Sequence, residues 1–280
     1  MITHEFDYAK PASLAEALDL LAADGVKPLS GGMSLIPMMK LRLAIPSKLV
    51  DLSGIGELTT LEMDGPIFIG GMTTHYAIES SKLIREHCPL LAQTAAQIGD
   101  VQVRNMGTIG GAVAHNDPAA DYPAALMALN ATVRTASKSG MRVMPIASFL
   151  VDALTTALEP GEIVTNIEVP SEPPGTGTCY HKVPHPASGY AVVGIAVRLL
   201  KQDGGITKAR IGVTGLASKA FRAAKVEEAL QSGASVVDAA ALVAEGVDAN
   251  SDIYASADYR KHLARVHTKR AIETALANCR

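Results

Sequence analysis

The chain has 280 residues, a net charge of −3 at pH 7, 48% hydrophobic residues and 4% aromatic residues. This length is enough for one large domain or for two to three small ones with their own cores. The sequence has no basic block and no zinc-finger spacing, so nothing in it argues for nucleic-acid binding. No apolar run approaches the roughly 18 residues of a membrane-spanning helix. We therefore expect a globular protein with an aliphatic core, no nucleic-acid partner and no integral membrane segment.

The three cysteines are odd in number and far apart, at Cys88, Cys179 and Cys279. This pattern fits a reducing compartment better than a disulfide framework. Three scattered cysteines also cannot by themselves supply a four-cysteine iron–sulfur or zinc site. The N-terminus has neither the basic region nor the apolar region of a signal peptide. We therefore expect a cytoplasmic protein.

Signals for helices and strands alternate through residues 1–55. Ser13 is a favourable helix cap, and Pro37 is tolerated only in the first turn of a helix. The expected elements are a helix, a strand, a second helix and a second strand, at residues 14–21, 26–29, 35–43 and 48–52. This order places a strand-to-helix turn at residues 30–34.

The region 56–170 begins with a hairpin and ends with a strand. The expected strands lie at residues 58–62, 67–69, 132–135, 142–144 and 162–169. The expected helices lie at residues 75–80, 82–87, 90–98 and 123–129. Gly70-Gly71 follows one of these strands and is interpreted as turn punctuation.

Residues 171–177 have the composition of a linker or a long surface loop, which places a domain boundary there. Beyond it, residues 191–200 and 206–213 predict a hairpin around Asp203-Gly204-Gly205. Three helices follow, at residues 220–230, 236–245 and 258–277. A hairpin followed by helices predicts a small α+β domain.

Two further glycine pairs lie in small-polar settings. The first glycine segment is Ser30-Gly31-Gly32-Met33-Ser34, and the second glycine segment is Thr108-Ile109-Gly110-Gly111-Ala112. Adjacent glycines remove the Cβ atoms that keep a ligand away from the backbone, so such turns present bare amides and nearby hydroxyls to a phosphate. Either pair alone is also typical of an ordinary turn.

Other candidate sites have simpler interpretations. His181 and His185 have the i,i+4 spacing of a helical metal site, but the neighbouring prolines forbid that helix, so we predict no metal. His115-Asn116-Asp117 has acid–base side chains, yet a polar loop that caps the following helix is the favoured interpretation. We predict no catalytic residue of the chain's own.

The order and spacing of several motifs closely resemble the FAD-binding medium subunit of the molybdenum hydroxylases, the family of carbon monoxide dehydrogenase and xanthine dehydrogenase. The two glycine segments carry the resemblance, with Pro28-Leu29 before the first and Val103-Arg104-Asn105-Met106-Gly107 before the second. It extends through Phe6-Asp7-Tyr8, Ile69-Gly70-Gly71-Met72-Thr73-Thr74-His75, Asp117-Pro118-Ala119-Ala120-Asp121 and Tyr259-Arg260-Lys261-His262-Leu263.

The resemblance implies an α+β fold with an FAD-binding domain of the PCMH, or vanillyl-alcohol-oxidase, type. That domain would comprise two α+β subdomains, residues 1–55 and 56–170. A small C-terminal domain, residues 178–280, would hold a three-stranded antiparallel sheet with helices.

The resemblance also implies which residues contact non-covalently bound FAD. Both glycine segments would grip the pyrophosphate, and Asp121 matches an acid that contacts FAD in relatives. Ile98 stands where xanthine dehydrogenases place an aromatic ring beside the isoalloxazine, so aliphatic contact is expected there. The remaining matches to flavin-contacting positions are Val164, Lys182 and Tyr190.

The implied function is electron relay within a larger complex. Substrate would be oxidised at a molybdopterin centre in a large subunit, and electrons would pass through [2Fe–2S] clusters of a small subunit to FAD here and then to an external acceptor. A dimer of heterotrimers is implied. The alternatives are a self-contained flavin oxidase and a nucleotide-binding scaffold. Met33 departs from the histidine of many relatives, which leaves the backbone amides of the first glycine segment to act alone.

Overall fold

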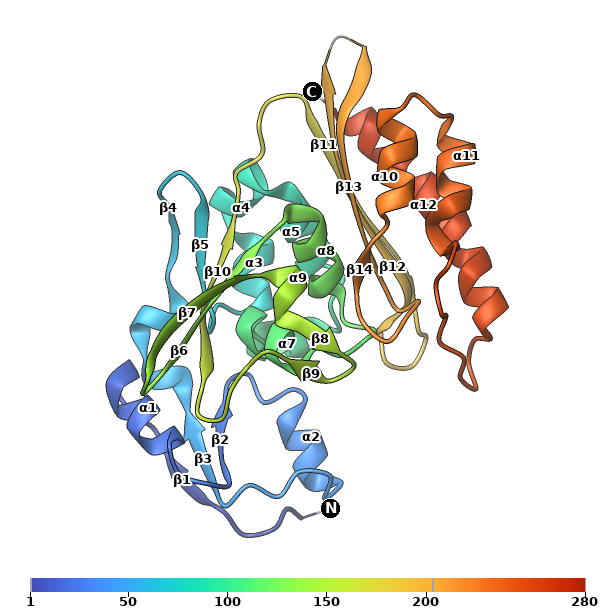
Figure 1. Cartoon of the computed structure of the whole chain (residues 1–280). Coiled ribbons are helices and arrows are strands. Elements are labelled where there is room, and N and C mark those ends of the chain that lie inside the picture. Colours follow the sequence, from blue (N-terminus) through green and yellow to red (C-terminus); the bar gives the residue numbers. More distant parts are fainter. Residues whose placement is uncertain (1, 203, 280) are drawn as a thin grey trace.

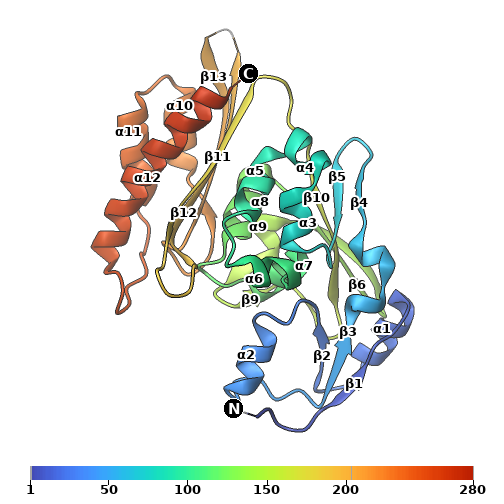
Figure 2. The ribbon, with the colours of Figure 1, turned by 180° about the vertical axis from the view of Figure 1, so that it is seen from behind.

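The computed structural model describes residues 2–202 and 204–279, and Figure 1 shows their arrangement. Within these residues the strands form sheets of three, five and four strands, which follow one another along the chain, and a two-stranded ribbon. The first two sheets lie together at one side of the molecule, and the third stands beside them with its own layer of helices (Figures 1 and 2). No helix of the described residues is both long enough and apolar enough to cross a membrane.

The N-terminal sheet is parallel and has the order β1-β3-β2. Its elements are β1 (Asp7–Ala9), α1 (Leu14–Leu21), β2 (Val26–Leu29), α2 (Leu35–Lys40) and β3 (Lys48–Asp51). Ser13 caps α1 as expected, because its Oγ accepts a hydrogen bond from the amide of Glu16 at 3.3 Å. The helix α2 ends at Lys40 rather than at the expected residue 43, since Arg42 adopts a left-handed backbone with φ 61°.

The middle sheet is antiparallel and has the order β4-β5-β10-β6-β7. Its strands are β4 (Leu61–Met63), β5 (Ile67–Gly70), β6 (Thr132–Ser137), β7 (Gly140–Pro145) and β10 (Ile163–Val169). The last strand along the chain, β10, inserts between β5 and β6 and therefore holds the region together. A short ribbon of β8 (Leu150–Asp152) and β9 (Thr155–Thr156) lies outside this sheet.

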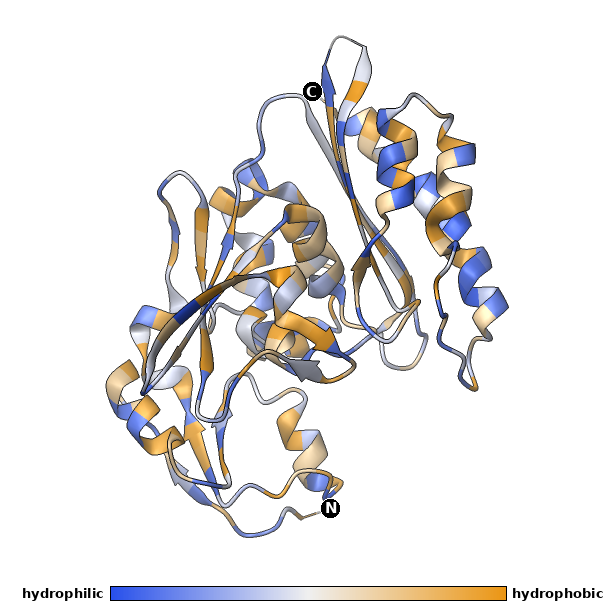
Figure 3. Cartoon of the chain, in the orientation of Figure 1, coloured by the Kyte–Doolittle hydropathy of each residue, from blue (hydrophilic) through white to orange (hydrophobic). Residues whose placement is uncertain are grey.

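Helices fill the region between the middle sheet and the C-terminal sheet. They are α3 (His75–Ser80), α4 (Lys82–His87), α5 (Pro89–Ala95), α6 (Val101–Met106), α7 (Ile109–His115), α8 (Asp121–Leu129) and α9 (Ile146–Phe149). Every residue of α8 is buried, as its almost uniformly apolar sequence requires, and Figure 3 shows its hydrophobic character between the two sheets. The helices α6 and α7 were not predicted from the sequence, because both are short and α7 has two glycines, which are poor helix formers, in its first turn.

The C-terminal sheet is antiparallel and has the order β11-β12-β13-β14. It comprises β11 (Thr176–Pro184), β12 (Ala191–Gln202), β13 (Gly205–Thr214) and β14 (Phe221–Arg222). The sheet therefore has four strands rather than the expected three. The additional strand, β14, has only two residues and was too short to recognise in the sequence. The strand β11 also begins inside the expected linker, because residues 176 and 177 already pair with β12.

One face of the C-terminal sheet is covered by α10 (Ala224–Gln231), α11 (Val236–Ala241) and α12 (Ala257–Asn278), and the other faces α8 (Figure 1). A Cβ atom at Gly212 would lie only 1.9 Å from the carbonyl oxygen of Ala124 in α8. The helix thus sits directly on the sheet backbone, and this contact joins the C-terminal sheet to the rest of the molecule.

Candidate functional site: a cofactor cavity

A cavity of about 1050 Å³ lies where the N-terminal sheet, the helices of the middle region and the loop before β12 meet. All but two of the predicted site residues line this cavity. Those on the wall are Ser30, Gly31, Gly32, Met33, Ser34, Ile98, Thr108, Gly110, Gly111, Ala112, Asp121, Val164 and Tyr190. Ile109 is fully buried in the hydrophobic core instead, and Lys182 lies behind the wall. Residues far apart in the sequence are therefore gathered around one space.

The first glycine segment connects β2 to α2 and offers free backbone donors. None of the described residues accepts a hydrogen bond from the amides of residues 31–34. Gly32, which lines the cavity, adopts φ +73°, a conformation that favours glycine. Four consecutive amides at a concave turn form a suitable site for an anion.

The second glycine segment is the first turn of α7 rather than a loop, and its amides are already used. The amide of Gly110 donates to the carbonyl of Gly71 at 2.9 Å, and that of Ile109 donates to the carbonyl of Thr73 at 3.0 Å. The amide of Gly111 donates to Oγ1 of Thr108, the N-cap, at 3.1 Å. The expectation of bare amides in both segments is therefore wrong for the second one.

One glycine in each segment, Gly31 and Gly110, allows close packing of the backbone. A Cβ atom at Gly31 would lie 2.1 Å from the carbonyl oxygen of Met106, and a Cβ atom at Gly110 would lie 2.5 Å from that of Gly71. The missing side chains thus let the two glycine segments and the end of β5 approach one another. Gly111 alone in the second segment has side-chain atoms as its nearest neighbours, namely Oγ1 of Thr108 at 3.0 Å and Ser30 at 3.5 Å.

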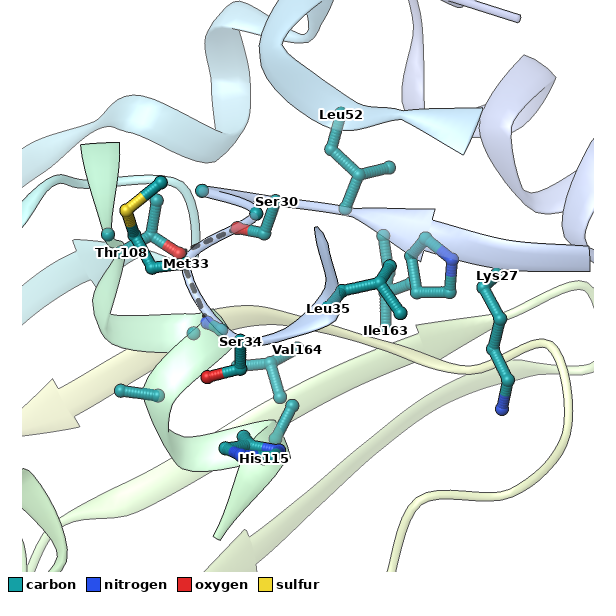
Figure 4. Close-up of a pocket in the computed structure, with 18 of the residues that line it drawn as sticks. Lys27, Ser30, Met33, Ser34, Leu35, Leu52, Thr108, His115, Ile163 and Val164 are labelled. Carbon is teal, nitrogen blue, oxygen red and sulfur yellow. Dashed lines mark hydrogen bonds between the residues drawn. The ribbon is translucent and has the colours of Figure 1, made fainter. Parts of the chain in front are cut away.

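Hydroxyl groups join the two segments at the cavity wall. Oγ of Ser30 lies 2.6 Å from Oγ1 of Thr108 and donates to the sulfur of Met72 at 2.9 Å. Figure 4 shows Ser30 facing Thr108, with His115 and Val164 along the neighbouring wall. The second segment therefore contributes the hydroxyl of Thr108, while the first contributes its amides and the hydroxyl of Ser30.

Asp121 and Lys182 form a buried ion pair at one end of the cavity. Nζ of Lys182 lies 2.9 Å from Oδ2 of Asp121 and also donates to the carbonyl of Gln97 at 2.7 Å. The Tyr180 hydroxyl donates to the other carboxylate oxygen. Burial raises the pKa of Asp121 above its usual value, and the lysine and the tyrosine offset part of this effect. Lys182 thus acts on the cavity through Asp121 rather than by lining it.

Ile98, Val164 and Tyr190 reach the cavity from three different elements. Val164 belongs to β10, while Ile98 lies between α5 and α6. Tyr190, in the loop before β12, is 40% exposed. Burial and the nearby carboxylate of Asp117 raise the pKa of Tyr190. Tyr190 and the first glycine segment line the same cavity, so residues of the C-terminal domain and of the N-terminal region share its wall.

Sequence reasoning missed Gly71, Met72 and His75, which also line the cavity. Gly71, which we interpreted as punctuation, supports the second glycine segment by accepting from Gly110. His75 is 4% exposed, and burial together with the nearby Arg104 lowers its pKa to about 4, so the ring is neutral near pH 7. The signal was present in the motif 69–75, which supported the resemblance but was not used to select site residues.

The polar sequence His115-Asn116-Asp117 ends the preceding helix rather than capping the following one. Asn116 takes a left-handed conformation with φ 46° at the end of α7, and its Nδ2 donates to the carbonyls of Asp152 and Thr155. Oδ1 of Asp117 accepts from the amide of Ala119. The following helix, α8, has no side-chain cap.

Comparisons with known proteins agree along the whole chain. Residues 4–172 match the family described as the FAD binding domain in molybdopterin dehydrogenase, and residues 178–275 match the CO dehydrogenase flavoprotein C-terminal domain. The carbon monoxide dehydrogenase medium chain of Afipia carboxidovorans is 38% identical over 100% of both chains. The glyceraldehyde dehydrogenase medium chain of Sulfolobus acidocaldarius is 37% identical over 98% of this chain and 99% of its own.

Solved structures show the same likeness. A chain in the crystal structure of a Cu,Mo-CO dehydrogenase in its cyanide-inactivated form has a TM-score of 0.95 at 37% identity. The match covers 99% of this chain and 100% of the other. Quinoline 2-oxidoreductase from Pseudomonas putida 86 gives a TM-score of 0.93 at 32% identity, over 100% and 99% of the two chains. The chain therefore belongs to the family of FAD-binding subunits of the molybdopterin dehydrogenases. The resemblance, the fold class and FAD as the cofactor are confirmed.

The cavity fits FAD by its own chemistry. Lys27 is the one lysine or arginine on its wall among the described residues, so a bound pyrophosphate must be held mainly by uncharged donors. The free amides of residues 31–34 supply such donors. The hydroxyls of the half-buried Ser30 and the buried Thr108 lie beside them.

Proposed function

We propose that this chain is the flavin subunit of a molybdenum hydroxylase complex and relays electrons. In this proposal, electrons come from [2Fe–2S] clusters of a small subunit, after substrate oxidation at the molybdopterin of a large subunit. The chemistry that FAD supplies when bound is electron transfer between such a donor and an external acceptor. The observation that carries the proposal is a large cavity with free amides and a buried ion pair.

The chain's own residues bind and orient the cofactor in this proposal. The amides of Gly31 to Ser34 hold the pyrophosphate, and the hydroxyls of Ser30 and Thr108 accompany them. Gly111 and Ala112 give the phosphates room at the start of α7, while Ile109 and Gly110 keep that helix seated. Asp121, held by Lys182, forms a hydrogen bond with the flavin. Ile98, Val164 and Tyr190 contact the ring system. No residue acts as a catalytic acid or base.

The proposed domain boundaries are those expected from the sequence: residues 1–55, 56–170 and 178–280. What supports them is that each region contains one of the three larger sheets. The proposed assembly is a dimer of heterotrimers, supported by the naming of relatives as medium chains of dehydrogenases. The cytoplasm is the proposed location, and the three free cysteines support it.

Co-expression with the neighbouring subunits tests the relay. We expect the isolated chain to bind FAD without bleaching its absorbance in the presence of organic substrate. We expect the full complex to bleach it in a molybdenum-dependent way. Substrate-driven bleaching in the isolated, metal-free chain would instead support a self-contained oxidase, and a colourless chain that never takes up flavin would support a scaffold.

Acid precipitation tests the non-covalent attachment. Neither glycine segment contains a histidine or cysteine to which the flavin could be linked. We expect all the flavin in the supernatant. Flavin that remains with the pellet would show a covalent bond, and the histidines on the wall, His75 and His115, would then be the first residues to replace.

A further inference from the structure

The loop between β11 and β12 is held in shape by one histidine. Nδ1 of His185 accepts hydrogen bonds from the amides of Ala187 and Ser188 and lies 3.2 Å from the Ser188 hydroxyl. The backbone amide of His185 donates to the carbonyl of Tyr190 at 2.7 Å, and its carbonyl accepts from Gly189 at 2.9 Å. Because Nδ1 accepts from two amides it carries no proton, so the neutral ring carries its hydrogen on Nε2.

The ring is fixed from outside the loop as well. It meets the ring of Tyr254 almost perpendicularly, with the centroids 4.1 Å apart and an interplanar angle of 81°. Nε2 is buried, and none of the described residues accepts a hydrogen bond from it. A perpendicular contact is the arrangement in which the edge of one ring is attracted to the π face of another. Pro184 and Pro186 restrict the backbone on both sides of the histidine.

This loop closes the cavity from the side of the C-terminal domain. Ser188, Gly189 and Tyr190 all line the cavity. A Cβ atom at Gly189 would lie 3.7 Å from Cα of Gly99, so the loop reaches the wall formed by the middle region. Tyr190 and Ser34 of the first glycine segment line the same cavity. The loop therefore contacts the middle region and shares the cavity wall with the N-terminal region.

The loop has few other means of holding this position. Residues 186–188 are exposed, and Tyr190 is 40% exposed. Three of the hydrogen bonds within the loop end at Nδ1 of His185, so the shape of the loop depends on this side chain. Its role is thus indirect, because no atom of His185 lines the cavity.

We propose that His185 is a positioning residue that holds Tyr190 and its neighbours as one wall of the cofactor cavity and thereby slows the release of FAD. This inference rests on the proposed function, since it needs FAD in the cavity. It involves no chemical step: the histidine acts only as a hydrogen-bond acceptor for the loop.

A matched pair of variants tests the acceptor. His185→Asn places an amide oxygen close to the position of Nδ1, whereas His185→Leu has nearly the same shape as asparagine and accepts no hydrogen bond. The measurement is the rate at which FAD leaves the full-length chain, followed by its fluorescence after dilution. Losing two to three loop hydrogen bonds leads us to expect release about tenfold faster in His185→Leu. We expect His185→Asn to release FAD at nearly the wild-type rate.

A second pair tests whether the effect passes through Tyr190. Tyr190→Ala should release FAD quickly, and adding His185→Leu to it should change the rate little further. Thermal unfolding of each variant without FAD checks that the fold survives. A His185→Leu rate equal to wild type, equal rates in the leucine and asparagine variants, or a full effect in the Tyr190→Ala background would each overturn the positioning role. A wild-type chain that binds no FAD would instead overturn the proposed function, and the positioning role with it.

Discussion

The two glycine segments have nearly the same sequence character, yet the structure uses them differently. In the first segment no described residue accepts from the amides of residues 31–34, and the backbone turns through Gly32 at φ +73°. In the second, the amides of Ile109 and Gly110 donate to Thr73 and Gly71 just after β5, that of Gly111 donates to the N-cap Thr108, and the chain is helical. A glycine pair therefore does not reveal whether its missing side chains admit a ligand or another stretch of backbone. The neighbours of each glycine decide this.

The largest effect should come from Gly110→Val, which tests whether this glycine serves packing. Its Cβ atom would lie 2.5 Å from the carbonyl oxygen and 2.8 Å from Cα of Gly71, and backbone atoms cannot move aside as a flexible side chain can. We expect a loss of about 3 kcal/mol or more in unfolding free energy. Urea denaturation of the chain without FAD measures it.

Gly111→Ala is the matched control for Gly110→Val. Its methyl group would meet Oγ1 of Thr108 at 3.0 Å and Ser30 at 3.5 Å, both side-chain neighbours. We expect the fold to remain as stable as wild type or slightly more stable, because alanine is the better helix former, while FAD affinity falls. Equal stability of the valine and alanine variants would refute the distinction between the two glycines.

The next effect is the loss of unfolding free energy in acid, and it arises at His75, next to the second glycine segment. A Cβ atom at Gly107, just before this segment, would lie 2.5 Å from Nε2 of His75, so the ring fills the space beneath it. Burial and Arg104 lower the pKa of His75 to about 4, below the 6.5 of an exposed histidine. Between these pH values the unfolded chain binds more protons than the folded chain, so stability falls as the pH falls.

His75→Gln removes this titration. We expect wild type to lose up to about 3 kcal/mol more than the variant between pH 6.5 and pH 4. Unfolding free energies at several pH values measure the difference. His267, whose pKa is also lowered to about 4, contributes equally to both proteins and cancels in the comparison. Parallel pH profiles for the two proteins would show that His75 is not buried in its neutral form.

A smaller effect is expected for Gly32→Ala in the first glycine segment. The left-handed backbone costs an alanine about 1–2 kcal/mol, but the nearest obstacle is the flexible end of Ile36 at 2.7 Å. We expect a folded chain with weaker FAD binding, because relief of the strain turns the free amides away from the cavity. Titration of the chain with FAD, alongside Gly65→Ala as a control at a distant positive-φ turn, separates lost binding from general strain. Equal affinities in the two variants would remove the special role of the first segment.

The sequence predicted most of the helices and strands, because strong periodicity and capping residues such as Ser13 act locally. The three domain boundaries stay a prediction. It did not predict α6 and α7, whose short helices are stabilised by tertiary contacts such as those of Ile109 and Val113 in the core. Thirteen of the fifteen predicted site residues line the cavity, whereas Gly71 and His75, which also line it, were not predicted. Their positions depend on the segment after β5 running against the start of α7, where Gly110 and Ile109 donate to Gly71 and Thr73, and no local pattern expresses this contact. The placement of Lys182 behind Asp121 likewise depends on how two domains meet.

The smallest effect should be the coupling between the two glycine segments through Ser30 and Thr108. Their hydroxyl oxygens lie 2.6 Å apart, and Oγ1 of Thr108 also caps α7. Ser30→Ala removes the contact between the segments and a weak hydrogen bond to the sulfur of Met72, whereas Thr108→Ala removes that contact and the helix cap. The threonine variant should therefore cost up to about 1 kcal/mol more. In the double variant the loss of unfolding free energy should fall short of the sum of the two single losses by about 0.5–1.5 kcal/mol, the usual contribution of one hydrogen bond.

This double-mutant cycle is measured by urea unfolding without FAD and again with FAD bound. If the coupling vanishes without FAD but appears with it, the hydroxyls act on the ligand separately and do not join the segments. If the coupling is present both with and without FAD, the packed second segment holds the amides of the first segment in place. The contrast between the two segments implies this dependence.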